Sequence, residues 1–565
     1  MNYQENFNQW LSQEKLDPTL RRELENIKDE KEIEDRFYTE LEFGTGGMRG
    51  KMGVGINRMN VHTIARVTKG LGNYLKKETD NADKGVVIAY DSRHKSPEFA
   101  QTAACVLGQM GIKAYLFTEL RPTPELSFAV RHLNAAAGIV ITASHNPKEY
   151  NGYKVYGPDG GQMVTASADA LIAEIALIKD YFDIDQTSIE TGLKSGVIVM
   201  LGEEMDEAYS QAVCSCCKEN LNSDLKVVYT PIHGSGNQPV RRVLKKLGYQ
   251  QVSVVPEQEK PDGNFTTAPY PNPEDRSVFT LAMKLAEDLE ADVIIGTDPD
   301  CDRVGVVCRD SGGEFVVLTG NQTGALLVDY YLKTRTELPE NKVVIKTIVT
   351  SELGAIVAKS YGAAVLDVLT GFKYIGECMT EFEKSHEYTF AFGYEESYGY
   401  LAGNYARDKD AVIASALVCE MTDYYKKKGM TLYEALVALF EKHGYFEEGI
   451  EAITLDGIEG KQKINAIMEV FRSLEVSQMA GLKIKEITDY KTSICRDLAT
   501  GQTKEVKLPK SNVLKFVFDD FSWFALRPSG TEPKLKIYFS ATGKTAQQAV
   551  DKKDHLKNQV LSIIK

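Results

Sequence analysis

The feature of this sequence that most constrains its fold is a repeated unit. A short run of apolar, mostly β-branched residues ends in a polar or glycine-rich loop, and a helical pattern follows. Such runs begin at residues 86, 138, 227, 293, 343, 365 and 390. The alternation is typical of successive β-α units. It predicts tandem α/β domains whose functional loops lie at the ends of strands.

A chain of 565 residues has the length of about three or four domains. Beyond residue 450 the pattern changes, because strand-like alternation at 513–518 and 535–539 precedes an amphipathic helical pattern. We therefore expect three tandem mixed α/β domains and a smaller C-terminal α+β domain around a central cleft. The expected domains are residues 1–205, 206–319, 320–450 and 451–565.

Charge and cysteine content limit the class of function. The net charge is −14, so no overall basic field indicates a nucleic-acid partner, and an anionic ligand needs a locally built positive site. Neither a signal peptide nor an apolar run of membrane-spanning length is recognised, so no membrane partner is expected. The nine cysteines are an odd number, which favours thiols in a reducing compartment, and we expect a cytoplasmic protein.

One loop is strongly acidic. Asp298, Asp300 and Asp302 follow an apolar run at spacings of two residues. Three carboxylates at this spacing can converge on one hard cation, and Mg²⁺ suits them because it completes its shell with water or phosphate oxygen. An EF-hand is excluded, since the sixth and twelfth positions of the loop are Arg303 and Arg309 rather than Gly and Glu. A solvated acidic turn is the alternative interpretation.

A second loop carries a hydroxyl at a strand end. Ser144 follows an apolar run, His145 is its neighbour, and Lys154 lies ten residues further on. Serine alone is a weak nucleophile, so Lys154 or His145 would accept or return a proton, and nearby cations would tolerate a covalently held phosphate. Taken alone, Ser144 is equally well explained as a helix cap. Its place corresponds to that of the acidic loop in the next domain, which favours the functional interpretation.

Two further loops suggest ligand binding. Arg527, Ser529, Gly530, Thr531 and Lys534 combine a guanidinium, hydroxyls, a small residue and an ammonium, which are the parts of a phosphate cradle. An ordinary turn between strands would also contain this glycine and its neighbouring prolines.

The other loop, residues 393–399, contains Glu395 and Ser397 but no basic residue. Carboxylates accept hydrogen bonds from sugar hydroxyls, so this loop fits a sugar better than a phosphate. A polar turn is the alternative.

Together these loops resemble those of the α-D-phosphohexomutases, in the same order and through nearly the whole chain. The N-terminal signature of that family is also present, and the length and the Gly-Thr-Gly-Gly sequence are closest to its phosphoglucomutase branch. One departure is Cys301, at a position where the family often has Gly or Ala. The segments that carry the resemblance are residues 43–50, 142–154, 298–303, 393–397 and 527–534.

The resemblance implies a role for each residue. Ser144 would carry the phosphoryl group, and Asp298, Asp300, Asp302 and the phosphoserine oxygen would bind Mg²⁺. Arg303 would assist the transfer, Arg49 would lie near the catalytic phosphate, and Lys154 with His145 would handle the hydroxyl proton. The substrate-binding residues implied are Lys373, Glu395, Ser397, Arg527, Ser529, Gly530, Thr531 and Lys534.

The implied activity is an intramolecular phosphotransfer that interconverts glucose 1-phosphate and glucose 6-phosphate. It would pass through a phosphoserine and a bisphosphorylated sugar, with Mg²⁺ as cofactor and glucose 1,6-bisphosphate as activator. Mannose or pentose phosphates are alternative substrates within the family. The sequence leaves the preferred sugar and the oligomeric state open.

Two other classes of function remain. Residues 300–304 match the Asp-x-Asp-x-Thr/Val pattern of haloacid-dehalogenase-like phosphotransferases, in which an aspartate, here Asp300, would carry the phosphoryl group. A sensor of sugar phosphates would bind without turnover, which is disfavoured because every chemical group of the mutase motifs is present.

Overall fold

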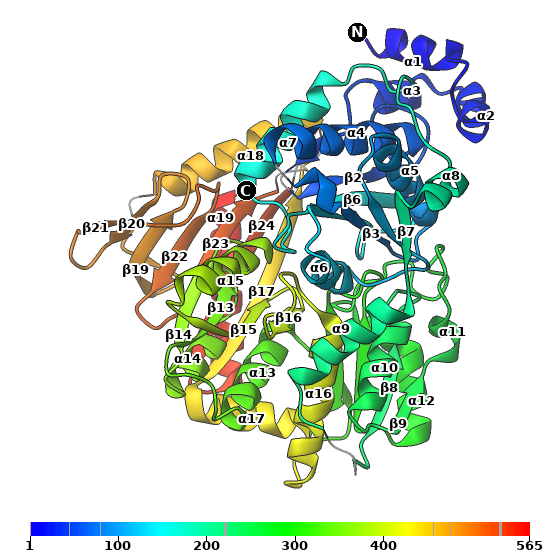
Figure 1. The fold of residues 1–565 in the computed structure, drawn as a ribbon. Coiled ribbons are helices and arrows are strands. Elements are labelled where there is room, and N and C mark those ends of the chain that lie inside the picture. Colours follow the sequence, from blue (N-terminus) through cyan, green and yellow to red (C-terminus); the bar gives the residue numbers. More distant parts are fainter. Residues whose placement is uncertain are drawn as a thin grey trace. The chain divides into compact units, whose positions relative to one another are not determined.

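The computed structural model describes residues 2–44, 46–79, 81–219, 223–455, 457–474, 476–529 and 534–564. The chain forms two compact units, each built from two separate segments. The first unit contains Met1–Thr319 and Phe372–Thr431, and the second contains Gly320–Gly371 and Leu432–Lys565. The expected third domain, residues 320–450, is thus divided between the units, and the four domain boundaries stay a prediction. Element labels follow Figure 1.

The first sheet of unit 1 has the order β1-β2-β6-β5-β3-β4-β7. Strands β5, β3, β4 and β7 are parallel, so the loops that follow them leave from one edge, whereas β6 and β2 are antiparallel additions. The strands are β1 (Phe43–Gly44), β2 (Gly47–Lys51), β3 (Val86–Tyr90), β4 (Ala114–Phe117), β5 (Ala137–Ile141), β6 (Tyr150–Tyr156) and β7 (Ile198–Leu201).

Helices accompany this sheet. Asn60 begins α4 with a capping box, in which its side chain accepts from the backbone N–H of Thr63 while the Thr63 hydroxyl accepts from the backbone N–H of Asn60. The helices are α1 (Tyr3–Ser12), α2 (Pro18–Asn26), α3 (Glu30–Phe37), α4 (Val61–Glu78), η1 (Ala82–Lys84), α5 (Ser96–Gln109), α6 (Thr123–His132), α7 (Thr165–Leu177) and α8 (Ile189–Ser195).

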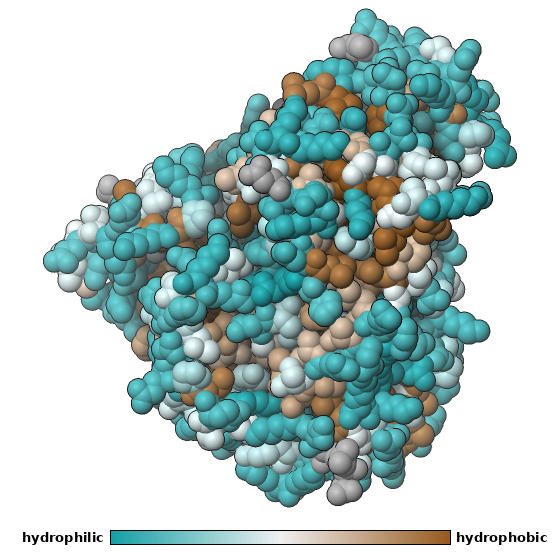
Figure 2. Space-filling view, viewed as in Figure 1, coloured by the Kyte–Doolittle hydropathy of each residue, from teal (hydrophilic) through white to brown (hydrophobic). Residues whose placement is uncertain are grey.

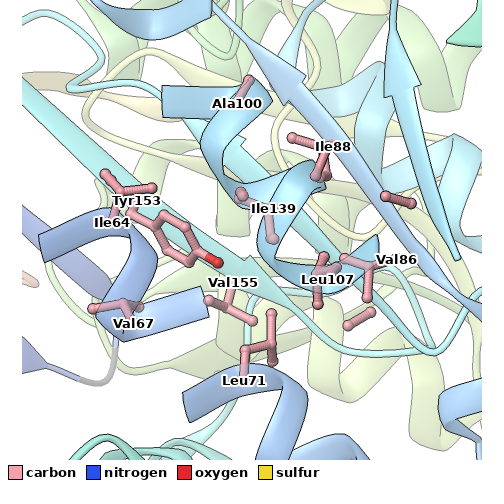
Figure 3. Packing of buried hydrophobic residues seen from close by; sticks show 14 of the residues in the cluster. Ile64, Val67, Leu71, Val86, Ile88, Ala100, Leu107, Ile139, Tyr153 and Val155 are labelled. Atoms are coloured by element: carbon pink, nitrogen blue, oxygen red, sulfur yellow. The ribbon is translucent and has the colours of Figure 1, made fainter. Parts of the chain in front are cut away.

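The core of this part lies between α4, α5 and the sheet. Figure 3 shows Ile64 and Leu71 of α4, Leu107 of α5 and Val155 of β6 directed into one apolar cluster. Tyr153 of β6 belongs to the same cluster. Because side chains alternate along a strand, the residue between Tyr153 and Val155 must face the other way. That residue is Lys154, so burial of its neighbours directs its ammonium to the opposite face of the sheet.

The second sheet of unit 1 has the order β12-β11-β10-β8-β9, with β9, β8 and β10 parallel. Nearby, β15 and β16 form an antiparallel hairpin. The strands are β8 (Lys226–Thr230), β9 (Gln251–Val254), β10 (Val293–Thr297), β11 (Val304–Arg309), β12 (Phe315–Leu318), β15 (Thr389–Glu395) and β16 (Gly399–Ala402), and the helices are α9 (Glu203–Ser215), α10 (Asn237–Lys246), α11 (Pro256–Glu259), η2 (Arg276–Phe279), α12 (Thr280–Leu289), α15 (Lys373–Ser385) and α16 (Ala411–Lys426).

Unit 2 combines a parallel strand pair with a larger antiparallel sheet. Strands β13 (Lys342–Thr347) and β14 (Ala364–Val368) are parallel, and α13 (Gly320–Thr334), α14 (Glu352–Ser360) and α17 (Leu432–His443) accompany them. The antiparallel sheet has the order β17-β24-β23-β22-β19-β20-β21, with β18 paired to β19.

One face of this sheet packs on α18 and α19, where Phe516, Phe524 and Phe539 form part of the apolar core. The elements are β17 (Tyr445–Thr454), α18 (Gly457–Arg472), β18 (Gln478–Met479), β19 (Leu482–Asp489), β20 (Ile494–Asp497), β21 (Thr503–Glu505), β22 (Leu514–Phe518), β23 (Trp523–Pro528), β24 (Lys534–Gly543) and α19 (Ala546–Ile564).

The surface drawn in Figure 2 is mainly hydrophilic, with scattered apolar residues. Among the described helices, none combines the length and apolar composition that crossing a bilayer requires.

Candidate active site

The serine loop follows β5 and is held in an unusual conformation. Ser144 is buried and has φ of +51°, a left-handed conformation that costs a non-glycine residue about 1–2 kcal/mol. The hydroxyl of Thr142 accepts a hydrogen bond from the Ser144 backbone N–H at 2.8 Å and donates one to Asp91 Oδ2 at 2.6 Å. These bonds offset the backbone strain and fix where the Ser144 hydroxyl points.

Arg93 holds the same loop from the neighbouring parallel strand. Its buried guanidinium donates to the carbonyl oxygens of Ser144 and Asn146, and to those of Pro147 and Tyr150 at 2.9 and 3.1 Å. No role was predicted for Arg93 from the sequence. Arg93 follows β3, which pairs with β5, so its place three residues past a strand end was the signal that could have identified it.

The acidic loop lies directly beside the serine. Asp298, Asp300 and Asp302 are buried, and one carboxylate oxygen from each lies within 4.8 Å of those from the other two. Ser144 Oγ donates to Asp298 Oδ2 at 2.9 Å. Cys301, in the left-handed conformation with φ of +53°, forms the turn that brings the alternating carboxylates together. The structure thus joins two loops that the sequence placed at two separate strand ends.

The carboxylates have different partners. Asp298 Oδ1 accepts from the backbone N–H groups of Asp302 and Arg303, both at 3.0 Å. Asp300 Oδ2 accepts from Lys154 Nζ at 2.9 Å and from the Thr123 hydroxyl at 3.0 Å. Burial and the two neighbouring carboxylates raise the pKa of Asp298 well above its usual value. Lys154 keeps the pKa of Asp300 below its usual value despite burial.

Two carboxylate oxygens of the acidic loop accept no hydrogen bond from the described residues. Among the described residues, Oδ1 of Asp300 and Oδ1 of Asp302 have no hydrogen-bond partner although both atoms are buried. Buried oxygens without donors are costly unless a cation or a ligand satisfies them. An all-oxygen donor set of this kind fits a hard divalent cation.

A second lysine reaches the acidic loop from the segment before α16. Lys409 Nζ lies 3.2 Å from Asp302 Oδ2 and 3.1 Å from Asp408 Oδ1. Tyr156 of β6 donates to Asp408 Oδ2 at 2.7 Å. This group was not predicted from the sequence, because residues 407–410 follow a hairpin and show no periodic pattern. Asp410 caps α16 through the N–H groups of Val412 and Ile413, which fixes the position of the preceding lysine.

The predicted basic residues surround the serine. His145 Nδ1 lies 3.2 Å from Ser144 Oγ. Burial, together with the nearby Arg303 and Arg49, lowers the pKa of His145 well below its usual value, so its imidazole is neutral. Arg303 donates to Glu274 at 2.8 Å, and Arg49 donates to Asn146 Oδ1 at 3.0 Å.

The predicted sugar loop is adjacent to the acidic loop. Glu395 ends β15 and is largely buried. Despite burial, the pKa of Arg303 is raised mainly by Glu274 and that of Lys409 mainly by Asp302, and the charge of Glu395 adds to both effects. The Val304 N–H donates to the Tyr398 carbonyl at 3.0 Å, which joins this hairpin to the acidic loop. Ser397 lies in the hairpin turn. Lys373 begins α15, and burial lowers its pKa.

The predicted phosphate-binding loop belongs to unit 2. Arg527 lies near the end of β23 and Lys534 begins β24. The Ser529 N–H donates to the Lys534 carbonyl at 2.7 Å, which closes the base of the loop. Gly530 and Thr531 lie outside the described residues.

Comparisons with known proteins cover nearly the whole chain. Phosphoglucomutase/phosphomannomutase α/β/α domains I, II and III match residues 40–182, 207–313 and 319–443, and the C-terminal domain matches residues 466–553.

The chain is 41% identical over 533 residues to a phosphoglucomutase of Staphylococcus epidermidis, an alignment that covers 94% of this chain and 96% of that protein. It is 42% identical over 515 residues to a phosphoglucomutase of Staphylococcus haemolyticus, with 90% and 91% covered. The open form of the Paramecium phosphoglucomutase pp63/parafusin has the same fold, with a TM-score of 0.67, 18% identity and 93% and 95% of the two chains covered.

Proposed function

This chain belongs to the phosphoglucomutase/phosphomannomutase family, and we infer that it interconverts glucose 1-phosphate and glucose 6-phosphate through a phosphorylated Ser144. The predicted family and the predicted class of fold are confirmed. The observation that carries the proposed mechanism is the position of Ser144 Oγ, 2.9 Å from a carboxylate oxygen of a buried cluster of three aspartates.

In the proposed reaction, a sugar hydroxyl oxygen attacks the phosphorus held by Ser144. The new bond between sugar oxygen and phosphorus forms as the bond to Ser144 Oγ breaks, which gives a bisphosphorylated sugar and an unmodified serine. The intermediate then reorients, and the other phosphoryl group returns to Ser144. Glucose 1,6-bisphosphate would restore the phosphoserine whenever the intermediate is lost.

The buried position of Asp298, Asp300 and Asp302 favours Mg²⁺ as the cofactor. The two carboxylate oxygens without partners provide ligand atoms, and Ser144 Oγ lies close enough for a phosphoserine oxygen to join them. When bound, Mg²⁺ would neutralise charge that develops on the phosphoryl oxygens. Arg303 and Arg49 would stabilise the same charge.

The proton of the sugar hydroxyl needs an acceptor. His145 is neutral, so it can take a proton, whereas the ion pairs that Lys154 makes with Asp300 and Asp302 outweigh its burial and raise its pKa. Lys154 is therefore an ammonium that can return a proton or bind a phosphoryl oxygen. We assign the proton transfers to this pair.

Substrate binding is divided between the two units. Glu395 and Ser397 would accept hydrogen bonds from the sugar, and Lys373 would contact the substrate. Arg527, Ser529, Gly530, Thr531 and Lys534 would bind the phosphate that does not react. Holding the remote phosphate in either orientation lets one serine serve both ends of the sugar. The cytoplasm stays the predicted location.

The first experiment replaces Ser144 by alanine. We expect the turnover rate to fall at least about 1000-fold, because the residue that carries the phosphoryl group is removed. Ser215→Ala, at an exposed position of α9, is the matched control and should leave turnover unchanged. Full activity of Ser144→Ala, with no phosphoryl group on the protein during turnover, would disprove the mechanism.

Phosphopeptide mapping separates this mechanism from the haloacid-dehalogenase alternative. Acid-stable phosphate on Ser144 supports the proposal, whereas an acyl phosphate on Asp300 contradicts it.

Substrate preference is tested by coupled assays on glucose 1-phosphate, mannose 1-phosphate and ribose 1-phosphate with a trace of bisphosphate activator. We expect the highest kcat/KM for glucose 1-phosphate. A higher value for either of the other sugars would reassign the substrate within the family.

A further inference from the structure

A long segment of unit 1, residues 260–275 between α11 and η2, contains neither helix nor strand. Loops of this length without regular structure are uncommon in compact domains, and ordered ones are usually functional. None of the residues predicted for the reaction lies in this segment. Its contacts with the candidate active site therefore deserve an explanation of their own.

Local hydrogen bonds order the first half of the segment. Asp262 accepts at Oδ1 from the Asn264 N–H at 2.8 Å and at Oδ2 from the Thr266 N–H at 3.0 Å. Between these two residues, Phe265 is buried and has a left-handed backbone, with φ of +49°. A bulky residue is strained in this conformation, so the surrounding contacts must maintain it.

This first half packs on the residue that holds the serine loop. The Arg93 guanidinium lies 5.0 Å from the centre of the Phe265 ring, which is a cation–π contact. A Cβ on Gly263 would lie 2.9 Å from the backbone nitrogen of His94, and His94 Nε2 lies 3.1 Å from Asn264 Oδ1. The segment is thus fixed against the loop that follows β3.

In the second half, Tyr270 contacts the proposed base. The centre of its ring lies 6.2 Å from that of His145 at an interplanar angle of 81°, an edge-to-face arrangement. Because Tyr270 is 46% exposed, its ring contributes little to the core. His145 Nδ1 lies 3.2 Å from Ser144 Oγ, so a contact that limits rotation of the imidazole also limits where its nitrogen atoms point.

Glu274 contacts the arginine of the acidic loop. Arg303 Nη1 donates to Glu274 Oε1 at 2.8 Å, and both side chains are partly buried. The Glu274 N–H donates to Oδ1 of the buried Asn272 at 3.1 Å. A Cβ on Gly305 of β11 would lie 2.6 Å from the Pro273 carbonyl oxygen, so the backbone beside Glu274 lies against that strand. Glu274 therefore holds the guanidinium from a fixed backbone.

We propose that residues 260–275 are a positioning segment for the phosphoryl transfer, in which Tyr270 orients the His145 imidazole and Glu274 orients the Arg303 guanidinium. The inference rests on the proposed function, since it concerns what His145 and Arg303 do in that reaction. A base must lie within hydrogen-bond reach of the hydroxyl that it deprotonates, and a cation must point to where negative charge develops. Tyr270 and Glu274 act through these two residues and are positioning residues.

Tyr270→Ala in the full-length protein tests the first contact. It should lower kcat about 10-fold and leave KM within about twofold of wild type, because the imidazole can then turn away from the sugar hydroxyl. Tyr270→Phe keeps the ring and should have a kcat at least about fivefold above that of Tyr270→Ala. Tyr38→Ala, just after α3 at an exposed position, is the matched control and should change neither constant. Equal kcat values for the two Tyr270 variants would overturn the role of the ring.

Glu274→Ala tests the second contact. It should lower kcat about 10-fold with KM within about twofold, because the guanidinium is no longer held toward the reacting phosphoryl group. The matched control is Glu287→Ala, which removes a similar pair, since Glu287 of α12 lies 2.7 Å from Arg309 of β11. Glu287→Ala should leave kcat unchanged, and an equal kcat for Glu274→Ala would overturn the role of Glu274.

Double-mutant cycles separate positioning from a general effect on stability. In a His145→Asn background, Tyr270→Ala should lower kcat by less than about twofold, since the residue that it orients is already lost. Glu274→Ala should behave in the same way in an Arg303→Lys background. A segment that only stabilises the fold would lower kcat by the same factor in both backgrounds, and that result would overturn the proposal.

Failure of this inference is distinguishable from failure of the proposed function. If Ser144→Ala is inactive while the cycles are additive, only the positioning role is wrong. If Ser144→Ala keeps full activity, the proposed reaction itself is wrong, whatever the cycles give.

Discussion

At the scale of the single residue, Arg93 shows how one buried side chain can fix the position of the catalytic Ser144 hydroxyl without contacting that hydroxyl. Its planar fork of donors matches the carbonyl oxygens of the serine loop. Lysine keeps the charge beside Asp91 but has a single ammonium, which cannot reach four carbonyls.

We therefore predict that Arg93→Lys lowers kcat by about 100-fold, because a displacement of about 1 Å at the reacting atoms has an effect of this size. Steady-state kinetics and the phosphorylated fraction of Ser144, measured by mass spectrometry, check the prediction. Arg241→Lys, at an exposed position, is the control. An Arg93→Lys protein with wild-type kcat would show that the carbonyl contacts are dispensable.

Glu448 of β17 gives a prediction about pH. Burial raises its pKa to about 7, although a hydrogen bond from Ser351 acts in the opposite direction. In the unfolded chain a glutamate has a pKa of about 4.3, so the folded protein binds the proton of Glu448 more tightly than the unfolded chain does. Protonated Glu448 therefore contributes to the free energy of unfolding at low pH, and this contribution is lost as the pH rises through about 7.

Glutamine imitates the protonated carboxyl, so Glu448→Gln should be more stable than wild type by about 2 kcal/mol at pH 8, with the difference narrowing toward pH 5. Thermal unfolding followed by Trp523 fluorescence, in a background with Trp10→Phe, measures the free energy of unfolding of unit 2. Glu451→Gln, on the same strand, breaks an ion pair with Lys557 and is the control, which should not stabilise at pH 8. Equal pH dependence of wild type and Glu448→Gln would contradict the assignment.

At the scale of the element, the loop between β8 and α10 supports the acidic loop from the side. A Cβ on Gly234 would lie 2.6 Å from Pro299 Cα and 2.8 Å from its carbonyl oxygen. Both atoms are backbone, so the acidic loop itself would have to move.

Gly234→Ala should therefore raise the Mg²⁺ concentration for half-maximal activity by about 10-fold to 100-fold, as is usual when a support of metal ligands is lost. Magnesium titration of turnover measures this. Gly202→Ala is the control, because the nearest atom to its Cβ, Thr118 Oγ1, is 3.6 Å away. An unchanged requirement for Mg²⁺ in Gly234→Ala would separate the metal from this loop.

At the scale of the whole molecule, the chemistry is distributed over two compact units. Ser144, the three aspartates and Glu395 belong to unit 1, whereas Arg527 belongs to unit 2. In the proposed reaction Arg527 binds the phosphate that does not react, so its loss affects substrate binding and leaves the metal site intact.

Arg527→Ala should lower kcat/KM by about 100-fold while the affinity for Mg²⁺ stays within about twofold of wild type, because a bidentate pair with phosphate contributes about 1.5–3 kcal/mol. Steady-state kinetics measure kcat/KM, and magnesium titration measures the affinity for Mg²⁺. Arg496→Ala, at an exposed position of the same sheet, should change neither. Equal losses in both assays would argue against a separate phosphate-binding loop.

The sequence alone determined the strands that begin at or next to residues 86, 138, 227, 293, 343, 365 and 390, the loops that follow them and the kinds of chemical group in those loops. These features are local: apolar runs specify buried strands, and polar residues directly after them, such as Ser144 and Asp298, must lie at a strand end. The same reasoning could have included Arg93, which follows β3 in the same way.

Only the tertiary structure decided which of these groups meet. Thr123 and Lys409 contact the acidic loop, and Asp408 pairs with Lys409. These contacts depend on strand order and helix packing between distant segments, which leave no local pattern. The left-handed backbone of Ser144 and Cys301 is likewise maintained by long-range hydrogen bonds and packing. The residue types of a loop are known from its own segment of the sequence, whereas the distance between two side chains from different segments depends on the complete tertiary fold.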